Sequence, residues 1–140
     1  MKPAWRMHEE RVAYRLNGKR VRGSGNGNRK GDVWVGKDWM IECKTTESGK
    51  YILNVKTLDK LAQQSLQAGL SAALVIVFHR SYVDFEMYVL VLERRLEDHH
   101  TDWKSITLTA DRLRQGITLT SRYGVWVSTD FDRFMDSILD

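Results

Sequence analysis

Cysteine and long apolar runs are both scarce in this sequence. Its 140 residues include one cysteine, Cys43, so no disulfide can form within the chain. This is typical of a reducing compartment, and we expect a cytoplasmic protein. The longest apolar run, residues 72–78, is far shorter than the roughly 20 residues that cross a membrane as a helix. Residues 1–6 contain no apolar segment of the secretory type, so we expect neither a signal peptide nor a membrane partner.

The composition is that of a globular domain. Charged residues make up 29% of the chain and hydrophobic residues 42%, both close to the average for folded proteins. These fractions exclude a chain that is disordered throughout. A length of 140 residues suits one domain with its own hydrophobic core.

The positive charge is unevenly distributed along the chain. The net charge is +4, but residues 1–30 hold nine lysines and arginines against two glutamates, a net of +7. Residues 31–140 have a net charge of −3. A basic segment of this kind favours a polyanionic partner, most often nucleic acid. The alternative is a solvated basic surface with no specific partner.

The spacing of apolar residues predicts a mixed α/β domain. Residues 23–31, with four glycines and two asparagines, cannot form a regular element and are expected to form a loop. Helices are predicted over residues 6–17, 57–68, 111–115 and 130–139. Strands are predicted over residues 19–22, 33–35, 39–44, 50–55, 73–78, 85–92, 106–108, 117–120 and 125–127.

Two of these elements have distinctive patterns. The helix over residues 57–68 has Thr57 as its expected N-cap and Gly69 as its expected C-cap. Its expected apolar face consists of Leu58, Leu61, Ala62 and Leu66. The strand over residues 73–78 is continuously apolar, which indicates burial on both faces of a sheet.

Acidic residues occur in and beside the predicted hairpin. Glu42 and Lys44 are two residues apart in a strand, so their side chains point to the same face, together with Met40. Cys43 points to the other face. If the strands pair around a turn at residues 36–38, Asp32 lies near the level of Glu42 and Lys44. Two carboxylates and one ammonium then converge.

Such a cluster suits phosphodiester hydrolysis. Close carboxylates repel each other, and a divalent cation removes that cost by taking both as oxygen ligands. A bound metal can activate water and stabilise the transition state, while a lysine offsets charge on the phosphate. The alternative is a cross-strand salt bridge between Lys44 and an acid.

The order of these residues resembles the PD-(D/E)xK nuclease superfamily. Within it, the pattern is most similar to the Holliday junction resolvases of archaeal type and to related phage resolvases. Gly31 stands where the superfamily often has proline. The motif reads Gly31-Asp32-Val33, then Ile41-Glu42-Cys43-Lys44.

The resemblance implies a single nuclease domain over residues 1–140, with an α/β, restriction-endonuclease-like core over residues 6–92. That core consists of a helix, a three-stranded β meander, a second helix and two further strands. Residues 93–140 have no counterpart and are expected to form a small β-rich C-terminal extension. The compact size also suits a phage-encoded protein that acts in the host cytoplasm.

The resemblance also implies an active site. The catalytic residues would be Glu9, Asp32, Glu42 and Lys44, with Asp32, Glu42 and Glu9 as ligands of Mg²⁺, for which Mn²⁺ can substitute. Glu10 is the other candidate for the helix acid. We choose Glu9 because apolar residues follow it at +3, +4 and +7, which places it at the edge of the core.

The resemblance further implies a homodimer that holds a four-way DNA junction and cuts two strands symmetrically. The enzyme would be a Mg²⁺-dependent crossover junction endonuclease. Two alternatives remain open, a restriction-like or nicking endonuclease on duplex DNA and a non-catalytic DNA-binding module on the same fold. Residues expected to contact the DNA backbone by charge and shape are Arg6, Arg11, Arg15, Lys19, Arg20, Arg22, Ser24, Arg29 and Lys30.

The remaining candidate residues have simpler interpretations. Cys43 is expected to be a core thiol, His99 and His100 to lie in a solvent-exposed loop, and His8 to lie at the surface. The tryptophans at 34, 39, 103 and 126 are expected in the core or at a dimer interface, and Trp5 at the start of the first helix. Residues 26–28 are not followed by the Gly-Lys-Ser/Thr of a phosphate-binding loop, so we expect no nucleotide cofactor.

Overall fold

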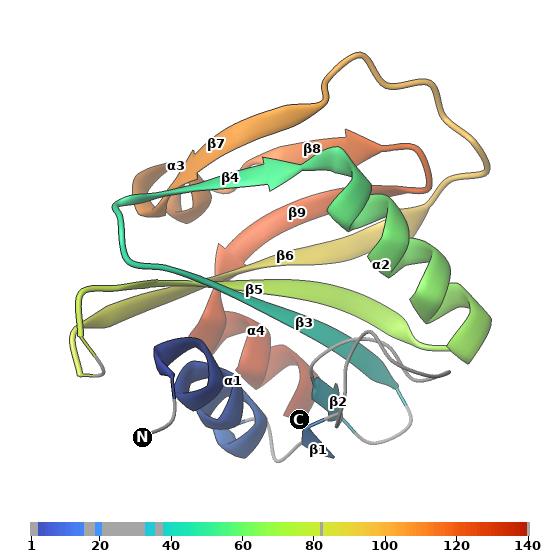
Figure 1. Cartoon of the computed structure of the whole chain (residues 1–140). Helices are drawn as coiled ribbons and strands as arrows, with labels where there is room; N and C mark the ends of the chain where they lie inside the picture. The colour runs from blue at the N-terminus through green and yellow to red at the C-terminus, as the bar shows by residue number, and fades with distance from the viewer. Residues whose placement is uncertain (1–2, 16–18, 21–32, 36–37, 82, 140) are drawn as a thin grey trace.

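The computed structural model of the chain describes residues 3–15, 19–20, 33–35, 38–81 and 83–139. It confirms the mixed α/β fold, with a large sheet flanked by helices (Figure 1). The helices are α1 (Ala4–Arg15), α2 (Val55–Ala68), α3 (Ala110–Arg114) and α4 (Phe131–Leu139). The strands are β1 (Lys19–Arg20), β2 (Val33–Val35), β3 (Trp39–Thr46), β4 (Lys50–Asn54), β5 (Ser71–His79), β6 (Phe85–Arg95), β7 (Ser105–Thr109), β8 (Thr118–Ser121) and β9 (Gly124–Asp130).

Seven of these strands form one sheet in the order β1-β2-β3-β5-β6-β9-β8. Strands β1, β2 and β3 form an antiparallel meander that contains the expected hairpin of β2 and β3, and β3 runs parallel to β5 with α2 in the connection between them. Strand β4 leaves this sheet and pairs with β7 in a separate two-stranded sheet. The C-terminal residues continue the main sheet, because β9 pairs with β6 and β8 with β9.

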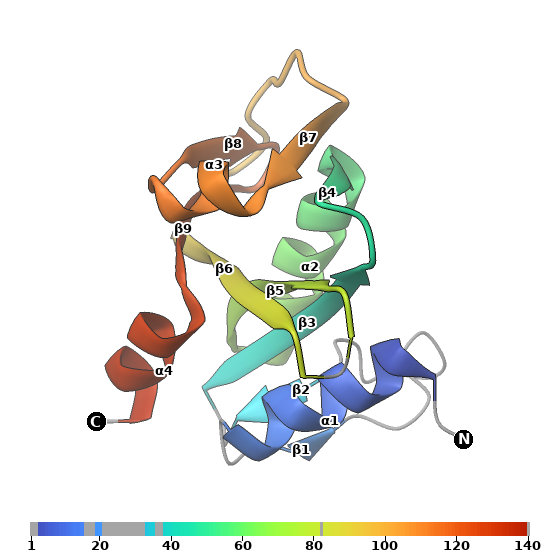
Figure 2. The same ribbon diagram turned by 90° about the vertical axis from the view of Figure 1, so that its left-hand side faces the viewer.

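The main sheet has a hydrophobic cluster on each face. Alternate residues of β5 point into the two clusters, so the strand is buried on both sides from Ala72 to His79, as its sequence predicts. One cluster, here called the α2-side cluster, includes residues of α2, β4, β7 and α3. The other, the α1-side cluster, includes residues of α1 and α4. In Figures 1 and 2 these two groups of elements lie on opposite sides of β3 and β5.

Helix α2 begins two residues earlier than the sequence analysis expected. Asn54, rather than Thr57, is the N-cap, and its side chain accepts a hydrogen bond of 2.9 Å from the Lys56 N–H. The predicted N-cap was wrong because Asn54, a strong capping residue, already stands at the end of β4. The C-cap prediction is confirmed, since Gly69 has the left-handed φ of 72° that favours glycine.

The buried face of α2 also differs at one position. Leu66 is 57% exposed, whereas Ser65 is fully buried. Arg95 of β6 explains the buried serine, because its guanidinium donates to Ser65 Oγ at 3.1 Å and to the Ala62 and Leu70 carbonyls. These bonds satisfy polar groups near the end of the helix. Among the described residues, no helix is both long and apolar enough to cross a bilayer.

Candidate active site

Glu42 and Lys44 lie side by side on one face of β3. Their partners on β5 are Leu74 and Ile76, both in the α2-side cluster, so the predicted alternation along the strand is confirmed. Lys44 Nζ is 3.3 Å from Glu42 Oε1. The side chains are 22% exposed for Glu42 and 38% exposed for Lys44. The pair is therefore fixed by a central strand but remains open to a ligand.

Strand β3 is held on both sides, which fixes the direction of the pair. It is parallel to β5 along its full length and antiparallel to β2. On the β2 side, Val33 pairs with Ile41, the residue before Glu42. Asp32, the residue before Val33 in the sequence, lies outside the described residues.

Glu9 is the buried acid of α1. Its residue is 5% exposed, whereas the Glu10 side chain is 36% exposed and lies 3.6 Å from the Arg6 guanidinium. Val12 of the same helix packs in the α1-side cluster. Helix α1 therefore lies on the opposite face of β3 from Glu42 and Lys44. It contacts β1, β2 and β3, at the edge of the sheet where β1 has two residues and β2 three.

Besides Arg6, which pairs with Glu10, two more of the predicted DNA-binding arginines make contacts within the protein. Arg11 lies over the Phe85 ring, with its guanidinium carbon 3.9 Å from the ring centre. Arg15 pairs with Asp132 of α4 and lies over Phe131. Of the remaining predicted contacts, Arg6 is described with its side chain, Lys19 and Arg20 are described by their backbone only, and Arg22, Ser24, Arg29 and Lys30 lie outside the described residues.

The expectation that His8 lies at the surface was wrong. The residue is fully buried, with its ring 4.6 Å from that of His79 and 5.5 Å from that of Phe85, centre to centre. Burial, reinforced by His79 and Arg11, lowers the pKa of His8 from 6.5 to about 4. The sequence carried a signal for this burial, because His8 stands four residues before the core residue Val12 and so lies on its helical face.

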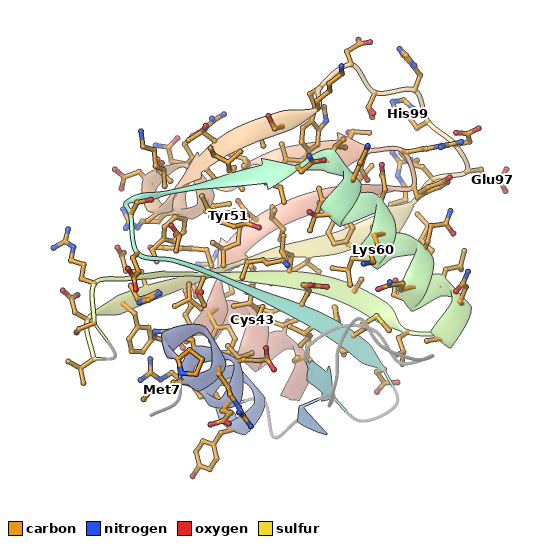
Figure 3. The ribbon with its side chains drawn as sticks, in the orientation of Figure 1. Met7, Cys43, Tyr51, Lys60, Glu97 and His99 are labelled. Carbon is orange, nitrogen blue, oxygen red and sulfur yellow. The ribbon has the colours of Figure 1, made fainter. Side chains whose placement is uncertain are left out.

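Tyr51 is a site residue that the sequence analysis did not identify. Burial alternates along β4 so that Tyr51 and Leu53 point inward, and Tyr51 packs against the α2-side cluster. Burial raises the pKa of the Tyr51 phenol, while Lys44 lowers it and Glu42 raises it. The phenol is thus within electrostatic range of both members of the pair. In Figure 3, Tyr51 lies on the β4 side of β3, and Met7 on the α1 side.

A pocket of about 540 Å³ lies at the ends of β5 and β6. Four carboxylates and two guanidinium groups line it, so its charge does not favour a phosphate group. One of these, Arg114, is already bonded to Glu86, Asp111 and Tyr88. The pocket therefore does not suit the phosphate groups that a site at Glu42 and Lys44 would bind.

The predictions for the other residues are mostly confirmed. Cys43 is a core thiol at 9% exposure. His99 and His100 lie in an exposed loop between β6 and β7, and Figure 3 shows His99 far from α1. Trp126 is fully buried, and Trp39 and Trp103 pack against the clusters. The side chains of Trp5 and Trp34 are not among those described.

The described residues alone do not form a metal centre. Among them, no group of three or more histidine, cysteine, aspartate or glutamate side chains lies close enough to hold a metal ion. Of the three predicted ligands, Glu9 and Glu42 are among the described residues and Asp32 is not. The Mg²⁺ site therefore stays a prediction that depends on Asp32.

Comparison with known proteins gives a similarity at the level of the fold. No model of a protein family matches the sequence, and no curated protein matches it. Among solved structures, the chain is similar to Hjc of Archaeoglobus fulgidus, a Holliday junction resolvase from an archaeal hyperthermophile. The TM-score is 0.50 at 16% sequence identity, and the match covers 76% of this chain and 88% of that chain. The chain therefore has a mixed α/β, resolvase-like nuclease fold.

Proposed function

We propose that this protein is a divalent-metal-dependent DNA endonuclease that resolves four-way junctions. The observation that carries the proposal is the contact of Lys44 Nζ with Glu42 Oε1 at 3.3 Å on a central strand of this fold. A carboxylate and an ammonium so placed can hold a metal and offset phosphate charge at the same point.

The metal ligands would be Glu42, Asp32 and Glu9. Because α1 packs on the opposite face of β3 from Glu42, Glu9 would have to reach the metal around the edge of the sheet, where α1 contacts the short strands β1 and β2. All three are carboxylates, the hard oxygen donors that Mg²⁺ prefers, so the donor set fits this ion in kind. When bound, the metal supplies a Lewis acid and lowers the pKa of a coordinated water. The burial of Glu9 at 5% exposure, against the pairing of Glu10 with Arg6, supports Glu9 as the helix acid of the set.

Lys44 contributes a positioned cation. Its ammonium has three donors, of which the Glu42 contact uses one. Because the side chain is 38% exposed, this cation can lie beside an attacking water and a phosphate oxygen when DNA is bound. Negative charge that develops on the phosphate during hydrolysis would be stabilised at this position.

The substrate proposal rests on charge and on the similarity of fold. Residues 1–30 carry a net charge of +7, which suits binding to the DNA backbone without base readout. A solved structure of similar fold is that of a Holliday junction resolvase. Symmetric cleavage of a junction requires two equivalent sites, so the active species would be a homodimer.

The test is cleavage of a synthetic four-way junction with Mg²⁺, compared with linear duplex of the same sequence. We expect paired, symmetric nicks in the junction and little cleavage of the duplex. Asp32→Asn and Glu42→Gln should bind the junction as wild type does but fail to cut it. Equal cleavage by these variants would disprove the active-site assignment.

Two other outcomes would support a different substrate or a different function. Preferential cleavage of linear DNA would indicate a restriction-like or nicking endonuclease with the same chemistry. Absence of cleavage of either DNA with both Mg²⁺ and Mn²⁺ would indicate a non-catalytic DNA-binding module on this fold.

A further inference from the structure

Four side chains from three elements are in contact beside α1, two of them buried histidines and two, Arg11 and Phe85, partly buried. They are His8 and Arg11 of α1, His79 at the end of β5 and Phe85 at the start of β6, and we refer to them as the histidine cluster. His8 is fully buried and His79 is 5% exposed. The cluster is not part of the motif that predicted the active site, and the proposed chemistry makes no use of it.

The contacts within the histidine cluster require defined orientations of the side chains. Arg11 Nη1 donates to His8 Nδ1 at 3.0 Å. A guanidinium can only donate, so Nδ1 must accept, and the proton of the neutral ring is on Nε2. The same guanidinium lies 3.9 Å above the centre of the Phe85 ring. Arg11 therefore joins His8 of its own helix to β6.

The contact with β5 fixes the same turn of the helix from a second direction. The ring of His79 lies 4.6 Å from that of His8, and the ring of Phe85 lies 5.5 Å from it. Apolar packing tolerates small shifts of a helix, whereas hydrogen bonds and ring contacts of this kind hold only at one rotation and depth. The helix is thus located against both strands at this turn.

The next residue of that helical turn is Glu9. A rotation of α1 by one residue, about 100°, would turn its carboxylate away from its buried position. We propose that His8, Arg11, His79 and Phe85 are positioning residues that set Glu9 for metal binding. This inference rests on the proposed nuclease function, with Glu9 as one of the metal ligands.

The inference gives Arg11 a different primary role from the DNA contact that the sequence analysis assigned to it. A phosphate contact would affect DNA affinity and its salt dependence. A positioning role would instead affect the rate of cleavage after the DNA has bound. A DNA contact by Arg11 would therefore change the affinity for the junction, whereas a positioning role would change kcat.

The test uses Phe85→Leu, with Phe85→Tyr as the conservative variant that keeps the ring under Arg11. We expect Phe85→Leu to lower kcat roughly tenfold to a hundredfold, as removal of groups behind metal ligands does. KM and junction affinity should change by less than about threefold, since no DNA contact is lost. Phe85→Tyr should restore kcat. Arg11→Gln should likewise lower kcat and leave junction affinity unchanged.

Two comparisons separate positioning from general stability. Phe134→Leu makes the same substitution on α4, in the same hydrophobic cluster, and should lower stability but leave kcat unchanged. In a Glu9→Gln background, Phe85→Leu should have no further effect on kcat, because the two changes act through the same carboxylate.

Several results would overturn the inference. Multiplicative effects of Phe85→Leu and Glu9→Gln would show independent action. Unchanged kcat in Phe85→Leu, or weaker junction binding with unchanged kcat in Arg11→Gln, would also disprove it. If wild type cuts DNA in these cases, only this inference fails. If wild type does not cut DNA at all, the proposed function fails, and this inference with it.

Discussion

The two faces of the central sheet bury different kinds of residue. Among the described residues, those that are polar and buried on the α2 side are the serines at 65, 121 and 128. These are neutral and hydrogen-bonded; Ser121, for example, accepts from Trp126 Nε1 at 3.0 Å. On the α1 side, the buried polar residues are His8, Glu9 and His79, all of which can ionise.

This difference indicates a division of roles. Burial of ionisable groups costs free energy unless they have partners, whereas a satisfied serine costs little. The serines on the α2 side, the face toward which Glu42 and Lys44 also point, therefore add polar contacts at little cost in stability. The α1 side retains groups that are expensive to bury, which is expected where a helix must present an acid to a site.

The largest effect should come from the α2 side and should appear in stability. Leu58→Ala removes a fully buried side chain of α2 and should lower the free energy of unfolding by about 3 kcal/mol. Urea denaturation measures this change. Leu66→Ala, at a 57% exposed position of the same helix, should cost far less. Similar losses in the two variants would contradict the described packing of α2.

A slightly smaller effect should appear in catalysis without a matching loss of stability. Lys44→Gln removes the ammonium beside Glu42 and should lower the rate of junction cleavage about a hundredfold. Its unfolding free energy should change by less than about 1 kcal/mol, because the pair is partly exposed. Lys50→Gln, at an exposed position of β4, is the matched control and should cut normally. A wild-type rate in Lys44→Gln would remove Lys44 from the chemistry.

The third prediction concerns pH and tests the α1 side. The pKa of His8 is about 4 in the folded protein and about 6.5 when unfolded. His8 in the unfolded chain thus takes up a proton near pH 6.5. In the folded protein it takes up that proton only near pH 4. Stability should therefore fall as the pH drops, by about 2 kcal/mol between pH 7.5 and pH 5.

The control for this pH dependence is His8→Asn, which cannot titrate. Its stability will be lower at both pH values, but the difference between pH 7.5 and pH 5 should shrink by about the same 2 kcal/mol. An unchanged difference in the variant would show that other groups cause the acid sensitivity.

The smallest effect should come from Tyr51→Phe. Burial raises the pKa of the phenol, so it is a neutral hydrogen-bond donor at the pH of cleavage. Loss of one such donor near Glu42 and Lys44 should slow single-turnover cleavage roughly threefold. Tyr123→Phe, which removes a phenol that packs against the same cluster elsewhere, should leave the rate unchanged. Equal rates for wild type and Tyr51→Phe would place the phenol outside the site.

The predictable part of the site came from short-range patterns. The two-residue period of β3 placed Glu42 and Lys44 together, and the helical spacing after Glu9 selected it over Glu10. The contributions of His79 and Tyr51 could not be predicted in this way. Each depends on a contact between elements distant in the chain, such as the 4.6 Å contact of His79 with His8.

The same limit applies to the fold. The alternation of Tyr51 and Leu53 indicates a strand, but no local pattern says that this strand pairs with β7 rather than with β3. The position of the N-cap, by contrast, was available in the sequence. Asn54 stands directly before the helical pattern and is a stronger cap than Thr57.

The pairing of β4 with β7 has a consequence for how the chain folds. The two strands are roughly fifty residues apart in the sequence, so their contact has a high loop-closure cost and forms late compared with local structure. Until β7 emerges during synthesis, β4 has an open edge with the exposed Ile52 upon it. A chain that ends before residue 105 would retain the strand with Glu42 and Lys44 but would expose an unpaired edge, which promotes aggregation.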